Sequence, residues 1–294
     1  MSKKLYIGLT LFILLILLSL IYLSIFGFKT EKFNSNISNN IKKVNKNLDI
    51  KLNNVNLILD LFKFKINAKT IGASLIYKNK EIQLESIKSN VSIKSLIKGE
   101  FLLTGINIST KSLEIKNFLS FIRLLKNDSR IFIAEQLINK GYLIADINIE
   151  FDELGNVKKN YEINGFVKDG QINLLKKYNF DKIDFIFNIK NEDILLNEFE
   201  VNLNKKNFFL PQVLIQKTKN EFLISGKINN NSISLNNNDL KNFIDVDLFG
   251  LKLQNIEFNS KNDFRFRINK DFEIDDFNFN SKLNIKKIEL NNFF

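Results

Sequence analysis

The chain has 294 residues, a formal net charge of +11 and no cysteine, histidine or tryptophan. Without cysteine there is no disulfide framework, and without histidine as well the usual zinc sites and most nucleophile–base pairs are excluded. We therefore expect no enzyme activity and no cofactor. Lysine outnumbers arginine 39 to 4, whereas proteins that read nucleic acid favour arginine, so we also expect no nucleic-acid partner.

The lysine excess runs along the whole chain together with an excess of asparagine. The codon usage of an AT-rich genome accounts for both. Attraction to anionic lipid headgroups is the functional alternative.

Residues 5–28 are apolar and carry no charge, and as a helix these 24 residues would reach roughly 36 Å. That length crosses a hydrocarbon core of about 30 Å. A cleaved signal peptide would have a shorter apolar region and a small-residue cleavage site, which Ser24–Phe28 does not offer. We therefore expect an uncleaved transmembrane helix, whose membrane-facing residues include Leu5, Phe12, Leu15, Leu18, Ile21 and Phe28.

Lysines flank this stretch on both sides, at Lys3 and Lys4 before it and at Lys29 and Lys32 after it. Lysine counts alone therefore do not set its orientation. A short basic leader before a long following domain favours residues 1–4 in the cytoplasm and residues 29–294 on the other side of the membrane.

Residues 29–49 show a helical period. Apolar residues recur at steps of three and four, which predicts a juxtamembrane amphipathic helix. It would lie on the membrane surface or cap the first strands, and its narrow apolar face favours capping. The residues of this face are Phe33, Ile37, Ile41, Val44 and Leu48.

Residues 50–116 change to a period of two, which predicts strands. The alternation slips by one residue near Leu61, where we expect a bulge or a tight turn. Further short strands are predicted over residues 74–77, 81–87, 90–93, 101–109 and 113–115.

Residues 117–141 interrupt the alternation and predict a helical hairpin inserted into a β protein. Residues 118–125 are apolar over a wide helical face, Asn127-Asp128-Ser129 offers capping side chains, and Lys140-Gly141 is a plausible stop.

Residues 142–294 alternate almost throughout and are rich in Phe, Ile and Leu. Breaks at Asn229–Asn231 and Asn236–Asn238 separate the predicted strands, whose spacing is that of an antiparallel meander. The apolar positions that we expect to line one face are Ile183, Phe185, Phe187, Ile189, Phe199, Val201, Leu203, Phe264, Phe266, Ile268, Phe277 and Phe279.

These strands each carry one apolar face, and no long helix is predicted after Lys140 to cover it. A sandwich, a closed barrel or a curled gutter would solve this, and long twisted sheets tend to curl or split. The predicted fold is mainly β, with an N-terminal transmembrane helix, a long curled antiparallel sheet and a small helical insertion. Its apolar face must meet protein, membrane or lipid chains.

Two stretches support a family resemblance: SNVSIKSLIKGEFLLTGINIST at Ser89–Thr110 and INGFVKDGQINLL at Ile163–Leu175. With the anchor and the β-only body, they make the chain resemble the AsmA-like and TamB-like proteins. The resemblance implies a bacterial inner-membrane, single-pass protein whose bulk lies in the periplasm as a repeating β-groove. Many members are far longer, so a short member, a fragment or one segment of a bridge is expected.

The function that the resemblance implies is passage of phospholipid toward the outer membrane. On that reading the groove binds phospholipid acyl chains and aids lipid transport to, or integrity of, the outer membrane. The alternative is a membrane-anchored envelope scaffold or assembly factor that pairs with outer-membrane or envelope proteins through its sheet edges.

Overall fold

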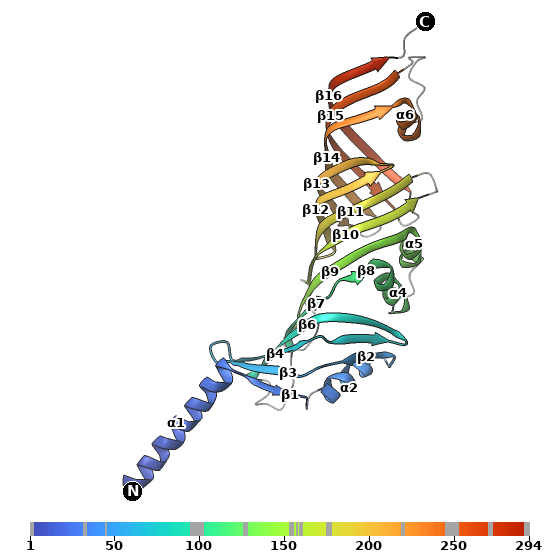
Figure 1. Ribbon diagram of the computed structural model, residues 1–294. Helices are drawn as coiled ribbons and strands as arrows, with labels where there is room; N and C mark the ends of the chain where they lie inside the picture. The colour runs from blue at the N-terminus through green and yellow to red at the C-terminus, as the bar shows by residue number, and fades with distance from the viewer. Residues whose placement is uncertain are drawn as a thin grey trace. The chain divides into compact units, whose positions relative to one another are not determined.

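The computed structural model describes residues 3–31, 34–44, 46–94, 103–125, 129–152, 156, 158, 161–174, 178–218, 221–244, 253–269 and 273–290. An apolar N-terminal helix precedes a mainly β body, which confirms those parts of the predicted fold (Figure 1). The strands form a 16-stranded sheet whose described pairs are antiparallel, in the order β1-β3-β4-β6-β7-β9-β10-β11-β12-β13-β14-β15-β16. Among the described residues, β1 and β16 lie at the two ends of this strand order, so the sheet is open and does not close into a barrel.

The chain divides into two compact units. Unit 1 comprises Met1–Leu113, Asn117–Phe132 and Ile144–Ile163, and unit 2 comprises Glu114–Lys116, Ile133–Leu143 and Asn164–Phe294. The elements up to β9 are α1 (Lys3–Ile25), β1 (Phe28–Thr30), α2 (Asn34–Val44), β2 (Leu48–Lys51), β3 (Val55–Asp60), β4 (Lys65–Ile71), β5 (Ser74–Tyr77), β6 (Lys80–Ser92), β7 (Leu103–Thr110), β8 (Leu113–Glu114), α4 (Ile115–Leu125), α5 (Ser129–Leu137) and β9 (Ile138–Glu150).

Helix α1 ends at Ile25, before the boundary expected at Phe28. The reason is Gly27, whose φ of 68° turns the chain out of the helix. Phe28 then pairs with Leu57 as the first residue of β1. A Cβ added at Gly27 would lie 2.6 Å from the carbonyl oxygen of Leu57, so this close approach requires glycine. The helix predicted over residues 5–28 was therefore too long at its C-terminal end.

Helix α2 is shorter than the helix expected over residues 29–49 and lies against β2. Asp49 joins the two elements: its carboxylate accepts a hydrogen bond from Ser38 at 2.5 Å and pairs with Lys42 at 2.8 Å. Ile37 is half-buried, whereas Phe33 and the side chains of Ile41 and Val44 lie outside the described part of the chain.

The core of unit 1 forms where α4 packs against the strands. Phe121 is 1% exposed and meets Tyr77 edge-on, with ring centroids 6.3 Å apart. The Lys80 ammonium donates to the Ser120 hydroxyl at 2.5 Å, which ties the same helix to β6. This helix therefore covers an apolar face of the first unit.

Two local expectations in the first half were wrong. The strands predicted over 81–87 and 90–93 are one strand, β6, because its first part pairs with β5 and its second part with β4. The helical stop expected at Lys140-Gly141 lies inside β9, since α5 ends at Leu137. The phase slip near Leu61 is a tight turn in which Asp60 accepts a hydrogen bond from the Lys63 N–H at 3.0 Å. Asn127 and Asp128 lie outside the described residues.

Unit 2 continues with long strands joined by tight turns. Its elements are β10 (Glu162–Leu174), β11 (Tyr178–Lys190), β12 (Asp193–Leu203), β13 (Lys206–Lys217), β14 (Phe222–Asn236), α6 (Asn237–Ile244), β15 (Leu253–Ile268) and β16 (Ile274–Leu290). The turns at Asn191-Glu192 and Asn204-Lys205 have positive φ at both residues, as two-residue hairpin turns of the right twist require.

Strand β14 runs through Asn229–Asn231, where a break was expected. A β-bulge replaces the break: the register with β15 shifts between Asn230 and Ile233, and Ser232 has a φ of 53°. The Ser232 N–H donates to the Asn259 side-chain oxygen at 2.8 Å. The bulge absorbs the slip in the alternation, so the strand continues.

Pro211 lies within β13, beside a register shift between β13 and β14. The register with β14 is irregular between Phe209 and Val213. A proline has no N–H to give to a ladder, and an irregular stretch is where a sheet tolerates that loss.

Candidate functional site

The apolar residues predicted in unit 2 lie on one face of strands β11–β16. Cross-strand partners point to the same side of a sheet, so the register defines rows of neighbouring side chains. One row crosses all six strands: Phe187, Leu196, Val213, Gly226, Phe264 and Phe279. A second row runs Ile189, Ile194, Ile215, Ile224 and Phe266. We call this side the apolar face.

Aromatic contacts join the other predicted residues to these rows. The ring of Phe185 stacks on the ring of Phe199, with centroids 5.3 Å apart. The ring centroid of Phe277 lies 6.3 Å from the ring centroids of Phe266 and Phe279. Val201 pairs with Phe208, and Leu203 pairs with Phe180. Ile268 pairs with Phe222 on one side and with Ile274 on the other.

Exposure on the apolar face rises toward β16. Ile183, Phe187 and Val201 are buried, and Phe185, Ile189, Phe199, Leu203, Phe264, Phe266 and Ile268 are half-buried. Phe277 and Phe279 are 67% and 47% exposed. The predicted residues therefore share one face but differ in accessibility, and β15 and β16 present the part that a ligand can reach.

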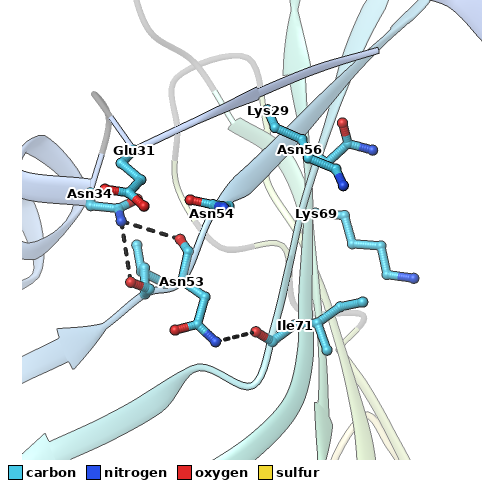
Figure 2. Close-up of a pocket in the computed structure, with 9 residues that line it drawn as sticks. Lys29, Glu31, Asn34, Asn53, Asn54, Asn56, Lys69 and Ile71 are labelled. Atoms are coloured by element: carbon cyan, nitrogen blue, oxygen red, sulfur yellow. Dashed lines mark hydrogen bonds between the residues drawn. The ribbon is translucent and has the colours of Figure 1, made fainter. Parts of the chain in front are cut away.

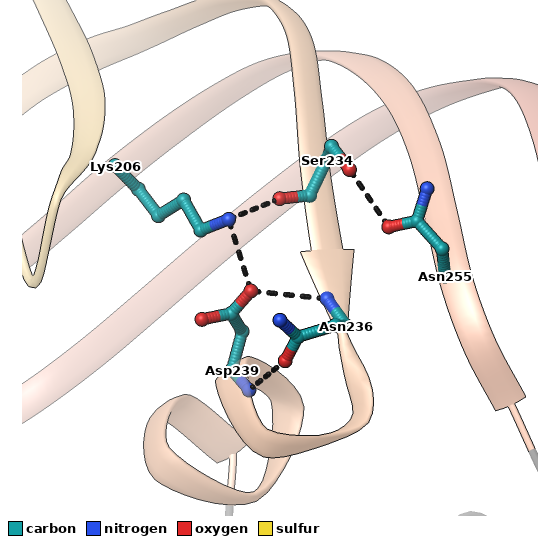
Figure 3. A network of polar contacts seen from close by, with 5 residues as sticks. All are labelled: Lys206, Ser234, Asn236, Asp239 and Asn255. Atoms are coloured by element: carbon teal, nitrogen blue, oxygen red, sulfur yellow. Dashed lines mark hydrogen bonds and ion pairs between the residues drawn. The ribbon is translucent and has the colours of Figure 1, made fainter.

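Helix α6 packs on one end of the apolar face, where Leu240 meets Ile233, Leu235 and Leu253. Its start is fixed by reciprocal capping: Asp239 accepts from the Asn236 N–H at 3.0 Å, and Asn236 accepts from the Asp239 N–H at 2.9 Å. Lys206 pairs with Asp239 at 2.9 Å and donates to the Ser234 carbonyl at 2.7 Å (Figure 3). This network holds the helix over the strand ends.

A polar belt crosses the apolar face between the end under α6 and the phenylalanine rows. Asn230 and Asn262 both donate to the Ser260 hydroxyl, at 3.2 and 3.0 Å, and Ser281 donates to Asn262 at 2.6 Å. Asn230, Ser260 and Asn262 are 6%, 4% and 8% exposed. Sequence reasoning missed this belt. The signal was present, because these residues occupy inward-facing positions within the apolar alternation.

The predicted anchor residues divide between two elements. Phe12, Leu15, Leu18 and Ile21 are exposed on α1, which is long and apolar enough to span a membrane. Phe28 is also exposed but lies in β1. The side chain of Leu5 lies outside the described part of the chain.

A polar pocket of about 760 Å³ lies beside the end of α1 in unit 1 (Figure 2). Lys29, Asn56 and Lys69 are successive cross-strand partners on β1, β3 and β4 and line it together with Glu31. Neither lysine has an ion-pair or hydrogen-bond partner among the residues the structure describes. Two ammonium groups and one carboxylate favour a ligand that carries an anionic group.

Hydrogen bonds around Asn34 and Asn53 shape the other wall of this pocket. The Asn34 amide donates to the carbonyls of Leu52 and Asn53 at 3.2 Å each, and Asn53 donates to the Ile71 carbonyl at 3.0 Å (Figure 2). The side-chain oxygens of Asn34 and Asn56 are buried and have no hydrogen-bond partner among the described residues. Sequence reasoning did not identify this pocket.

Comparison of the chain with protein-family models, with curated proteins and with solved structures finds no match. Among the described residues, no group of three or more Asp and Glu side chains could hold a metal ion.

Proposed function

We propose that this is a membrane-anchored, non-enzymatic protein whose apolar face in unit 2 binds the acyl chains of phospholipid. The observation that carries the proposal is the pair of apolar rows on β11–β16, which lead to the exposed Phe277 and Phe279 on β16. Fully burying one such side chain is worth about 1.5–3 kcal/mol, so a ligand that covers several of them gains substantial binding energy. Hydrocarbon chains supply that cover without needing hydrogen-bond partners.

The proposed groove forms where the sheet of unit 2 bends around the acyl chains. Support comes from bulge residues with positive φ inside the long strands, because a bulge bends its strand and increases the local twist. These residues are Lys182, Glu198, Ser232 and Asp276.

The proposed location is the inner membrane of a bacterium with an outer membrane, with α1 as the single anchor and the rest of the chain in the periplasm. There the protein aids phospholipid transport to, or integrity of, the outer membrane. Support comes from α1, from the apolar face and from the resemblance to AsmA-like and TamB-like proteins. The pocket at Lys29 and Lys69 adds a place for a lipid phosphate beside the anchor.

A matched pair of variants on β16 tests acyl-chain binding. Phe277→Asp with Phe279→Asp adds two charges on the apolar face, and Asn278→Asp with Asn280→Asp adds the same charges on the opposite face of the same strand. All four positions are exposed, so the fold tolerates the changes. We expect the first variant to copurify with less phospholipid than wild type and the second to match wild type. Equal lipid content in all three proteins would refute the proposal.

The second candidate function is an envelope scaffold that pairs with partner strands. It is favoured by strand β16, which lies at one end of the strand order and is 17 residues long. Capture of a protein partner on β16 by a chain that holds no lipid on its apolar face would favour the scaffold.

A further inference from the structure

Strand β16 forms an open edge of the sheet, where another strand can pair. It pairs with β15, and no other described strand pairs with its outer side. A long exposed edge with apolar side chains associates readily with another strand, and natural proteins usually protect such an edge. Its side chains on the apolar face are exposed: Ile274, Phe277, Phe279, Leu283, Ile285, Ile288 and Leu290.

The sequence of β16 is self-complementary about Ser281. In an antiparallel pair of two identical strands centred on this residue, positions equally distant from it face each other. Phe279 then faces Leu283, and Phe277 faces Ile285. Ile274 faces Ile288 in the same way. In each of these three pairs an apolar side chain meets an apolar side chain of the other copy, and all six positions lie on the apolar face.

The charges of β16 follow the same symmetry. Asp275 faces Lys287 and Asp276 faces Lys286, and the two-fold axis repeats both pairs. Asp276 and Lys287 have partners within the chain, Arg267 at 3.3 Å and Glu289 at 2.5 Å, yet remain 66% and 61% exposed. Lys286 donates to the Ser232 hydroxyl at 2.5 Å.

One pair at the ends of the strand is unfavourable, because Glu273 faces Glu289. The negative charge of Glu289 is offset by its ion pair with Lys287 in the same chain. The central pairs are complementary, so opposite charges outnumber like charges across the edge.

Two of the three register shifts between β15 and β16 are symmetric about Ser281: one lies between Asp275 and Asn278, the other between Ile285 and Lys287. The third shift, at Glu289 and Leu290, comes from an extra residue on β15, Gln254, and not on β16. The extra residues, Asp276 and Lys286, are equally distant from Ser281. In the two-fold pair they face each other, so the alternation of the two strands stays in phase along the whole edge.

We infer that β16 is a docking surface for β16 of a second copy of this chain, paired antiparallel about Ser281. Apolar matching, charge matching and the two symmetric bulges each point to that occupant. The pair joins the apolar faces of two copies into one surface. The inference does not depend on lipid binding, because it concerns the edge of the strand.

A single introduced cysteine tests the register, because the chain has no cysteine of its own. Directly opposed residues in antiparallel strands have Cα atoms about 4.5–5.5 Å apart, which a disulfide can span. We expect full-length Ser281→Cys in detergent to form a disulfide-linked dimer on mild oxidation. Asn278→Cys is the control, since its two copies would lie roughly 20 Å apart. Absent or equal crosslinking in the two variants would overturn the inference.

A charge exchange tests the chemistry of the pairing. Asp275→Lys with Asp276→Lys, and Lys286→Glu with Lys287→Glu, each place like charges across the edge. We expect each variant alone to self-associate at least about tenfold more weakly than wild type, a change of about 1.4 kcal/mol, with unchanged circular dichroism. An equimolar mixture should restore dimers, measured by native mass spectrometry. A monomeric wild type at micromolar concentration, or a mixture that stays monomeric, would contradict the proposed pairing.

Discussion

The ring of Phe264 lies directly against the backbone of its cross-strand partner Gly226. A Cβ added at Gly226 would come within 2.8 Å of the ring Cζ and 2.8 Å of the Gln212 carbonyl oxygen. The glycine therefore leaves room for the phenylalanine in the middle of the six-strand row. This relationship explains why an apolar row contains a residue with no side chain.

The first prediction follows from that contact. Gly226→Ala should lower the free energy of unfolding by about 1–3 kcal/mol, because the added methyl group overpacks against Phe264 and backbone. Gly105→Ala is the matched control, since its Cβ would meet the Ile149 carbonyl oxygen at an ordinary 3.5 Å. Urea unfolding followed by circular dichroism measures both. A Gly226→Ala protein as stable as the control would contradict this prediction, because it would show that Phe264 and the neighbouring backbone make room for the methyl group at no cost.

The sequence predicted the β class of unit 2 and the composition of its apolar face, because alternation is a direct consequence of strand geometry. The positions named at Phe264, Phe266 and Ile268 do share one face. The sequence did not predict how far each strand runs. Asn229–Asn231 has the composition of a turn, and only the bulge at Ser232 with the Asn259 side chain shows why β14 continues.

Other features depend on contacts between residues distant in the sequence. Hydropathy alone did not predict the end of α1, because Phe26 and Phe28 are as apolar as the helix itself. The turn at Gly27 ends the helix, and the pairing of Phe28 with Leu57, a tertiary contact, fixes the chain as a strand from there on. The pocket at Lys29 and Lys69 has the same origin, since its lysines come together through the intervening strand β3.

The second prediction concerns acid stability near α2. Hydrogen bonds from Lys42 and then from Ser38 lower the pKa of Asp49 from 3.8 to about 2. A carboxyl group with a lowered folded-state pKa stabilises the fold above its unfolded pKa and loses that contribution as pH falls through the folded value. Asp49→Asn should therefore be less stable than wild type at neutral pH, by less than about 1 kcal/mol because the pair is partly exposed.

That difference should shrink as pH falls from about 4 to about 2, because protonation of Asp49 removes the same interactions in wild type. Thermal unfolding of the two proteins across this pH range measures it. A stability difference that stays constant down to pH 2 would show that Asp49 acts by some means other than its charge.

The third prediction concerns the pocket beside the anchor. Lys29→Gln with Lys69→Gln should reduce the anionic fraction of the phospholipid that copurifies with the full chain, because each lysine near an anionic surface contributes about 1 kcal/mol. Lys261→Gln with Lys282→Gln is the control, since these exposed lysines are cross-strand partners on β15 and β16. Equal anionic fractions in both variants would remove the pocket from the lipid-binding account.

The proposed function requires acyl chains to contact the apolar face of unit 2. The most direct measurement places a photo-crosslinking amino acid at Phe279 and, in a second protein, at Asn280, adjacent exposed positions that point to opposite faces of β16. Each full-length protein is irradiated in membranes that contain phospholipid labelled on its acyl chains. We predict strong lipid labelling from position 279 and little from position 280. Equal labelling from both positions, or none from 279, would contradict the proposed lipid-binding face.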